Sequence, residues 1–515
     1  MLKPDEPYKL VDGDATICGR LLAAGRLRLI TPLIIGGGSS LYGDSDIVVL
    51  KDMQGQPYIP SSSITGALKG DFNNYSYKGS VDQDKYKQNK LWFWGGEDTF
   101  KKNDEKVRRS CQSALMISDL VLPEGSTAQL SIRDGIRINR STGIVEPGAK
   151  YDFEIVEPGI AFNFRMEVIV RKAFNPELFN SFFDWIVYQL SQGKIALGAR
   201  TNKGFGRCRL ENISSYRYDY QDRDHIIAWL TEDEEKVKQP AGDFSQVDKL
   251  FKKETRQFSI KADFRIKNSL IVGSYSGDPS ASDKVHLNSY DSEDSTKEVA
   301  VLPGTSIRGA IRSHAERIIN TLGGDGNEML KGLFGWVDTE KPDNGRNEAI
   351  KGRIKIEEKP ITLNTFMEEI QYRIKIDRFT GGVINNALFD SMPIWAGQGD
   401  ESMVTLELDI DRYLDWEAGL MLLVLKDLWN GDLAVGGEKN VGRGTLLGQR
   451  ATICLDDQTI VIKKETEGLT FQNEDGSTGW DEETVEKLEN LVKELHKKIN
   501  EPGAKQGNEV LSDAE

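Results

Sequence analysis

The sequence GARTNKGFGR at residues 198–207 returns as GGEKNVGRG at residues 436–444. Each loop follows an apolar run typical of a helix, and each arranges its glycines around an asparagine and an arginine. Gly198 and Gly436 are as far apart in the chain as Asn202 and Asn440, so the loops align at one constant offset. One such loop is ordinary turn chemistry, whereas two loops at one offset indicate an internal repeat.

Four further blocks repeat in the same order and at nearly the same offset. The paired blocks are 33–36 with 270–273, 60–69 with 303–312, 93–95 with 333–335, and 139–143 with 377–381. Five ordered blocks predict two copies of one domain in the chain. The offset rises between the first and the second of these pairs, which places a six-residue insertion in the second copy, between its first strand and its first helix.

The repeats divide the chain into four parts. We expect a first domain at 1–212, a connector at 213–256, a second domain at 257–464 and an acidic tail at 465–515. The tail still contains apolar residues at helical spacing, which predict one amphipathic helix. These residues are Val485, Leu488, Val492, Leu495 and Ile499.

Composition sets the broad class. The 515 residues carry a net charge of −15, which by itself argues against nucleic acid, although local basic clefts remain compatible with it. The four cysteines have no C-x-x-C pairing, so neither a zinc site nor a disulfide framework is indicated. Because no apolar run reaches membrane-spanning length, we expect a soluble, cytoplasmic protein with no membrane partner.

Within each copy, strands alternate with single helices, which predicts an α+β sandwich with helices on one sheet face. In the first copy we expect a helix that begins at Ser61 and is capped by its serines. A long hairpin is predicted at 132–158 and a helix at 176–190. The polar segments 75–90 and 97–109 are interpreted as loops or an exposed insertion.

Two features suit phosphate binding. Glycine-rich loops expose backbone N–H groups to an anion, and Arg207 and Arg443 would add charged donors. The helix starts at Ser63 and Ser306 offer further N–H groups. Taken singly, each feature is better explained as a tight turn or a plain capped helix.

The motifs together resemble the RAMP superfamily of CRISPR systems, and most closely the backbone subunits of type III effector complexes. The motifs that carry the resemblance are the two glycine-rich loops, the glycines at 36–38 followed by an aspartate loop, YIPSSSITGALK at 58–69 and the Arg-x-Thr-Gly turn at 140–143. The resemblance covers both repeats but neither connector nor tail. Two fused copies are similar to the tandem subunit of type III-D variants.

The resemblance implies a ferredoxin-like (RNA-recognition-type) core in each repeat, with the hairpins acting as thumbs. It implies that the subunit lies along a guide CRISPR RNA, beside other type III effector subunits. The thumbs would press into the duplex between guide and complementary target RNA. In the family, a loop aspartate cleaves the target; its best matches here are Asp46, with Asp44 as a rival, and Asp283 in the second copy.

The resemblance also implies a set of RNA contacts. The predicted contacts are Gly36, Gly37, Ser63, Lys69, Arg140, Arg200, Lys203, Arg207, Ser306, Arg308, Arg312, Arg378, Lys439 and Arg443. Asp46 and Asp283 could act as bases or hold a divalent cation such as Mg²⁺, which prefers oxygen ligands.

The histidines limit the chemistry. His225, His286, His314 and His496 all lie outside the first repeat, which excludes a two-histidine mechanism there. His286 either assists in the second repeat or is a surface residue without a role.

Three functions remain open: a catalytic backbone subunit, a non-catalytic guide scaffold, and a nuclease that processes guide precursors. The duplication and the histidine distribution argue against the third. An unrelated nucleotide hydrolase is excluded because neither loop has the G-x-x-x-x-G-K-[ST] pattern.

Overall fold

The computed structural model describes fourteen stretches of the chain. They are residues 15–37, 46–102, 105–140, 142–233, 235, 237–239, 244–274, 282–337, 349–363, 369–396, 402–456, 458–465, 468–473 and 482–501. Asp44 and the end of the tail lie outside them.

The first repeat is built on an antiparallel sheet in the order β10-β9-β1-β8-β5. Strand β1 (Ile17–Leu29) lies between β8 (Ala161–Arg171) and β9 (Cys208–Asp219), and β5 (Leu115–Ile117) pairs with β8. β9 continues past residue 212, the expected limit of the first domain.

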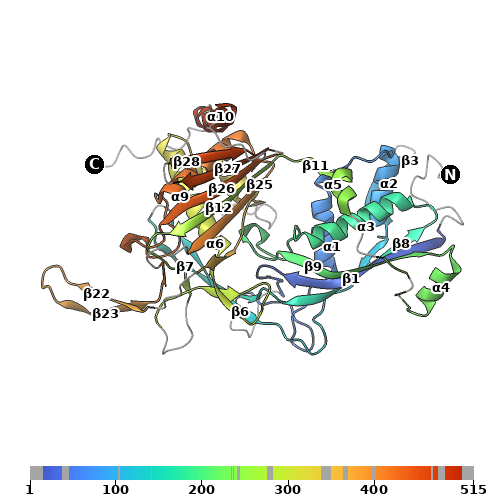
Figure 1. Cartoon of the computed structure of the whole chain (residues 1–515), viewed down its shortest axis with the longest axis horizontal. Helices are drawn as coiled ribbons and strands as arrows, with labels where there is room; N and C mark the ends of the chain where they lie inside the picture. The colour runs from blue at the N-terminus through green and yellow to red at the C-terminus, as the bar shows by residue number, and fades with distance from the viewer. Residues whose placement is uncertain are drawn as a thin grey trace.

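Two helices cover one face of this sheet (Figure 1). Helix α1 (Ser61–Phe72) follows β1, and α3 (Pro176–Ser191) follows β8. The start of helix α3 is marked in the sequence by Asn175 and Pro176. The Asn175 side chain accepts hydrogen bonds from N–H groups of the first turn, and proline is favoured as the first residue of a helix.

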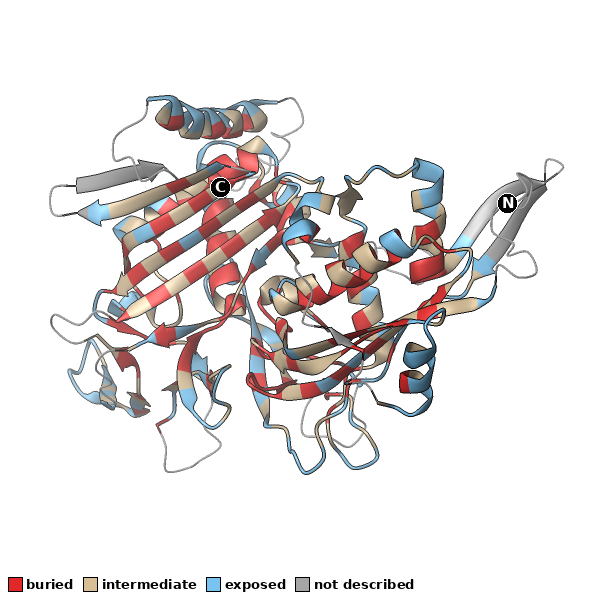
Figure 2. Ribbon diagram, turned by 45° about the vertical axis from the view of Figure 1, so that its right-hand side comes forward, coloured by how far each residue is buried: buried red, intermediate tan, exposed pale blue. Residues whose placement is uncertain are grey.

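The second repeat has the same arrangement. Strand β12 (Gln257–Ile266) lies between β25 (Met403–Asp411) and β26 (Leu446–Leu455), and β20 (Ile354–Ile356) pairs with β25. Helices α6 (Gly304–Thr321) and α9 (Asp415–Asn430) occupy the places of α1 and α3. Along β25, partly buried and fully buried residues alternate, as expected for a strand whose two faces differ in burial (Figure 2).

The second sheet is wider than the first. β27 (Gln458–Glu465) and β28 (Gly468–Asn473) extend it beyond β26. On the other side it continues through β21 (Lys359–Thr362), β17 (Glu298–Leu302) and β16 (Asn288–Tyr290). Each repeat has its own cluster of buried apolar side chains, which agrees with a mixed α+β protein of two repeats.

Both predicted hairpins are present. The first consists of β6 (Leu130–Ile138) and β7 (Val145–Val156), and the second of β22 (Gln371–Ile376) and β23 (Val383–Ser391). Hairpin β6–β7 runs toward the second repeat, whereas β22–β23 projects from the molecule (Figure 1).

Two local predictions were wrong. The segments 75–90 and 97–109, expected to be loops or an exposed insertion, include regular structure: helix α2 (Gln83–Trp94) and the hairpin of β3 (Gly96–Lys102) and β4 (Glu105–Cys111). Helix α2 was not predicted because most of its residues are polar or charged, and its buried aromatic residues lie together at one end. These are Trp92, Phe93 and Trp94.

The expected serine cap of α1 is also absent. The residue before α1 is Pro60, and the Ser61 N–H donates instead to the carboxylate of Asp119 at 2.7 Å. The group that satisfies the helix start therefore comes from a distant part of the chain.

The connector packs on the first repeat. Its strand β11 (Phe251–Lys253) pairs with β2 (Tyr75–Tyr77), and Phe251 joins the buried aromatic residues of that repeat. The remaining short elements are α4 (Arg223–Leu230), β10 (Lys238–Gln239), η3 (Phe244–Gln246), α5 (Val247–Leu250), β13 (Ser269–Leu270), β14 (Gly273–Ser274), β15 (Val285–His286), α7 (Gly326–Met329), α8 (Lys331–Phe334), β18 (Trp336–Val337), β19 (Ala349–Ile350) and β24 (Ile394–Trp395).

The predicted tail helix is α10 (Glu482–Asn500), which lies against α9. Leu491, Leu495 and Ile499 are buried and belong to the apolar core of the second repeat. Figure 2 shows the buried side of α10 turned toward that repeat. The two helices approach closely at Gly419, where an added Cβ would lie 2.2 Å from the carbonyl oxygen of Leu491. Among the described helices, none is long and apolar enough to cross a membrane.

Candidate nucleic-acid interface

The two glycine-rich loops have the same backbone. Each contains a short 3₁₀ turn, η1 (Thr201–Lys203) or η4 (Lys439–Val441). Arg200 and Glu438, which occupy equivalent positions before these turns, have left-handed φ angles of 58° and 56°. A Cβ added at Gly206 or Gly444 would lie 1.9 Å from a backbone carbonyl oxygen, so both positions require glycine.

The two loop arginines are not equivalent. At the offset that aligns the loops, Arg443 corresponds to Phe205, and Arg207 corresponds to Thr445. Arg443 is buried, and its Nε donates to the Glu438 carboxylate at 3.0 Å. Arg207 forms an ion pair with Glu357 of the second repeat. Both guanidinium groups are therefore held by protein carboxylates.

The first loop packs against the second repeat. A Cβ on Gly204 would lie 2.4 Å from the Glu358 nitrogen, and one on Gly304, at the start of α6, would lie 2.4 Å from the Lys203 carbonyl oxygen. Beside this contact, Arg133 of β6 binds both carboxylate oxygens of Glu358, at 2.6 and 3.0 Å. Arg133 is 5% exposed and Glu358 6%, so this is a buried bidentate pair between the repeats.

Carboxylates of the second sheet also line this junction. Arg207 lies near Glu407 as well as Glu357. Burial, and then the charge of Glu357, raise the pKa of Asp409 to about 6. Carboxylates of the second repeat thus lie close to one another and to Arg207 where the two repeats meet.

A group of cations from three elements gathers at the same junction. This basic cluster comprises Arg137 and Arg140 of the first hairpin, Arg200 and Lys203 of the first loop, and Arg308 and Arg312 of α6. Burial, and then its cationic neighbours, lower the pKa of Lys203. Burial, followed by Arg140, lowers the pKa of Arg312.

The basic cluster has few acidic partners. Among the residues that the structure describes, the ion pairs formed by its members are those of Arg140 with Glu316 and Arg137 with Glu146. A buried guanidinium nitrogen of Arg200 and another of Arg312 lack a hydrogen-bond partner. Cations held together without enough counter-charge define a candidate site for an anion such as phosphate.

Two more predicted RNA contacts, Arg308 and Lys69, form hydrogen bonds within the protein itself. Arg308 is buried and donates to the carbonyl oxygens of Ile354 at 2.6 Å and Phe334 at 2.8 Å. Burial lowers the pKa of Arg308 to about 10. Lys69 donates to the Gly95 carbonyl oxygen at 2.7 Å. Both cations thus bind carbonyl groups at the end of a helix, α8 or α2, which indicates structural roles.

At other predicted RNA contacts, the backbone N–H groups already donate hydrogen bonds within the protein or the backbone pairs with a neighbouring strand. The Gly37 N–H donates to the Val48 carbonyl at 2.9 Å, and Gly36 bridges to Val49. The N–H groups of Ser63 and Ser306 donate to the proline three residues earlier, at 3.0 Å in each case. Neither helix start therefore presents its serine N–H freely.

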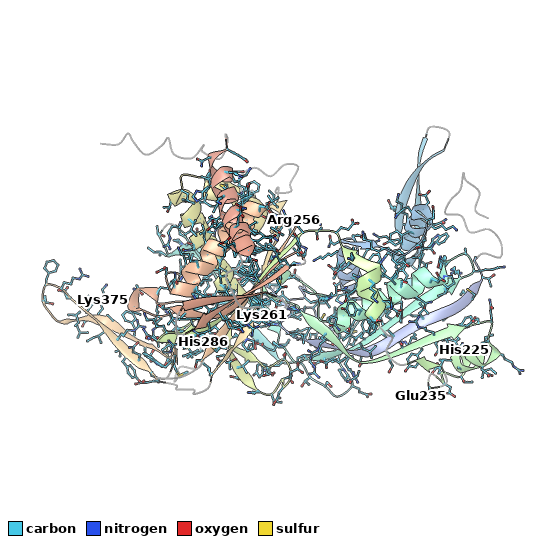
Figure 3. The ribbon with its side chains drawn as sticks, turned by 45° about the horizontal axis from the view of Figure 1, so that its top comes forward. His225, Glu235, Arg256, Lys261, His286 and Lys375 are labelled. Carbon is cyan, nitrogen blue, oxygen red and sulfur yellow. The ribbon has the colours of Figure 1, made fainter. Side chains whose placement is uncertain are left out.

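The second repeat contributes two exposed or half-buried cations. Arg378 is exposed at the tip of hairpin β22–β23, where Lys375 also lies (Figure 3). Burial, and then the charge of Arg317, lower the pKa of Lys439.

The structure places Asp46 and Asp283 at equivalent points, at the base of each hairpin. The Asp46 carboxylate accepts from the Asp152 N–H at 3.0 Å, and the Asp283 N–H donates to the Asp390 carboxylate at 2.6 Å. Asp152 and Asp390 are related by the same offset as the two loops, so each candidate aspartate contacts the same hairpin position, but the donor and the acceptor are exchanged between the repeats. Within the described residues, no group of three or more His, Cys, Asp or Glu residues could hold a metal ion.

His286 is not the surface residue that the sequence suggested. It is buried; its Nδ1 accepts from the Val272 N–H at 3.2 Å, and its Nε2 lies 3.0 Å from the Val301 carbonyl oxygen. Burial lowers the pKa of His286 to about 4, so the ring is neutral near pH 7. Figure 3 shows it within the second repeat, where it serves packing.

The hairpins carry apolar surface that sequence reasoning missed. Ile132, Ile136 and Ile138 of β6 are exposed, as are Tyr372, Ile374 and Ile376 of β22. At the second tip, Phe379 is 98% exposed. The alternation of apolar side chains along each strand was the available signal.

A cavity of about 600 Å³, called the socket below, lies in the second repeat. Its lining includes Arg265, Lys267, Gln371, Trp395, Gly442 and Arg443. Gln371 and Gly442 are the counterparts of Arg133 and Gly204, which contact the second repeat. An added Cβ on Gly442 would meet no atom within 4 Å. The surface that is covered in the first repeat is therefore open in the second.

Sequence comparison agrees with this duplicated geometry. A model of the RAMP superfamily matches residues 26–209 and again residues 263–446. The chain belongs to the RAMP superfamily. Proteins of this superfamily are typically CRISPR-associated RNA-binding subunits, and some are endoribonucleases. Comparison with curated proteins gives no match.

Proposed function

We propose that this protein is a tandem backbone subunit of a type III CRISPR effector, similar to those of type III-D variants, and that it binds guide RNA. The basic cluster between the repeats is the observation that carries the proposal. The order of the main strands, β9-β1-β8-β5 and β26-β12-β25-β20, is that of a ferredoxin-like core and supports one in each repeat.

In this proposal, the basic cluster holds phosphates of the guide, since Arg and Lys contacts to phosphate supply most sequence-independent affinity. The exposed apolar faces of the two hairpins contact bases of the guide–target duplex. Apolar and aromatic side chains suit base stacking, as Tyr372 and Phe379 would provide.

For cleavage, Asp46 and Asp283 each accept the proton of a target 2′-hydroxyl. The 2′-oxygen attacks the adjacent phosphorus to form a 2′,3′-cyclic phosphate, while the bond from phosphorus to the 5′-oxygen breaks and that oxygen takes a proton from water and leaves as a hydroxyl group. A Mg²⁺ ion, which is commonly bound by one or two carboxylates together with phosphate oxygens, would be held by either aspartate and the RNA and would stabilise the developing negative charge. The equivalent positions of the two aspartates support cutting at two points one repeat apart.

Replacing Asp46 or Asp283 with alanine tests this step. Each substitution is expected to abolish one product band of target-RNA cleavage by the assembled effector with Mg²⁺, while guide binding persists. Asp52→Ala, which removes a half-buried turn carboxylate, is the control and should leave both bands. Unchanged bands in both variants and in Asp44→Ala would indicate the alternative function, a non-catalytic guide scaffold.

The socket supports docking of a neighbouring effector subunit. In the first repeat, the corresponding surface receives Glu358, so we expect the socket to receive an acidic side chain of a neighbour. Arg265→Glu with Lys267→Glu should lower the amount of other effector subunits that co-purify with the chain. Equal recovery with the reversed charges would contradict this docking mode.

A further inference from the structure

The two loops carry opposite charges at one equivalent position. Arg200 of the first loop and Glu438 of the second are equivalent in the sequence repeat and share the left-handed backbone described above. The same point of the same loop therefore carries a cation in one repeat and a carboxylate in the other. Because the backbone at this position is the same in both loops, Arg200 and Glu438 can be compared for the effect of side-chain charge.

Glu438 is surrounded by cations of its own repeat. It forms ion pairs with Arg373, with Arg443 at 3.0 Å and with Lys284 at 3.4 Å. Burial raises the pKa of Glu438, but the hydrogen bond from Arg373 and the charges around it outweigh burial and lower it. The carboxylate stays ionised and lies between these three cations, where it offsets part of their positive charge.

Arg200 has the opposite surroundings. Its guanidinium carbon lies 4.3 Å from the Phe153 ring centroid and 4.8 Å from that of Tyr151, so the group is held against the base of the first hairpin. One of its buried nitrogens has no hydrogen-bond partner, as is also true of one nitrogen in each of the two arginines that pair with Glu438. Unlike them, Arg200 forms no ion pair with a carboxylate among the described residues; burial, and then the charge of Arg200, lower the pKa of the nearby Lys203. The first loop therefore keeps charge available for an outside anion.

We propose that Glu438 is a built-in anion for the second loop, and that only the first loop holds a phosphodiester of the RNA backbone. The inference rests on the proposed RNA-binding function and deepens it. The two loops have the same backbone conformation but differ in their expected affinity for phosphate. Contact with the guide is accordingly concentrated at the junction between the repeats.

The test measures binding of the full chain to a fluorescent single-stranded RNA over a salt series. For Arg200→Gln, we expect weaker binding and a log K against log salt slope that is smaller by about 0.7, the value for one lost phosphate contact. Lys439→Gln removes a second-loop cation that the resemblance implies to be an RNA contact, so it tests the difference between the loops directly; we expect it to reduce the slope by less than Arg200→Gln does. Glu438→Gln keeps the side-chain shape and frees Arg373 and Arg443, so it should bind RNA at least as tightly as wild type.

Each contrary result has a distinct meaning. If Lys439→Gln lowers the slope as much as Arg200→Gln, or Arg200→Gln leaves it unchanged, the inequality of the loops is refuted. If Glu438→Gln weakens binding while its melting temperature is preserved, Glu438 is not a surrogate anion. If the wild-type chain binds no RNA at all, the proposed function itself fails.

Discussion

Replacing Arg133 with alanine is expected to lower the free energy of unfolding by about 3–5 kcal/mol, the usual cost of removing one partner of a buried ion pair. The change would leave the Glu358 carboxylate buried without its bidentate donor. Chemical denaturation followed by tryptophan fluorescence measures the effect. Because Arg133 lies on the first hairpin and Glu358 in the second repeat, the loss should also uncouple the two repeats.

An exposed ion pair on the same hairpin provides the control. Arg137 pairs with Glu146 but its side chain is 74% exposed, so Arg137→Ala should cost no more than about 1 kcal/mol. Glu157 is also buried, and its carboxylate lies 3.9 Å from the Arg133 guanidinium, so its charge has to be removed as well. A triple replacement, Arg133→Met with Glu358→Leu and Glu157→Gln, should recover much of the stability that Arg133→Ala loses, since none of these three groups then carries a buried charge. An effect of Arg133→Ala as small as that of Arg137→Ala would contradict the buried contact.

Gly206→Ala and Gly444→Ala are each expected to destabilise the protein by about 2 kcal/mol or more. A left-handed backbone costs a non-glycine residue roughly 1–2 kcal/mol, and here the added Cβ would also lie 1.9 Å from a carbonyl oxygen. The loop must shift to relieve this overlap. Thermal unfolding of the two variants should show similar losses, because the loops repeat.

Two glycines at the hairpin turns separate the causes. Gly143 and Gly381 have φ angles of 70° and 69°, but an added Cβ there would meet no atom within 4 Å. Gly143→Ala and Gly381→Ala should therefore cost only about 1–2 kcal/mol, the backbone contribution alone. Equal losses at the turns and the loops would show that crowding does not constrain the glycine-rich loops.

Sequence periodicity predicted the duplication because a repeated domain must reuse its tight backbone positions. The glycines of the two loops, the hairpin turns and the helix starts are such positions, and their spacing survives changes elsewhere. Helix α2 was missed because its apolar residues cluster at one end among charged neighbours, so they do not recur at helical spacing.

The roles of individual cations were less predictable, because they depend on partners far along the chain. Arg133 and Glu358 are 225 residues apart, and Arg207 meets Glu357 across the same junction. No local pattern marks which arginine will find a carboxylate. The gathering of Arg200 and Arg312 into one basic cluster follows likewise from the packing of the first loop on α6.

The most direct test of RNA binding by the junction compares salt dependence for two triple variants. Arg200→Gln, Lys203→Gln and Arg312→Gln together should reduce the log K against log salt slope for single-stranded RNA by about 2, at roughly 0.7 per lost contact. Neutralising three exposed lysines outside the basic cluster, Lys87, Lys297 and Lys464, is the matched control and should leave the slope near that of wild type. Equal slopes for the two triple variants would contradict the account, because they would place the RNA elsewhere on the protein.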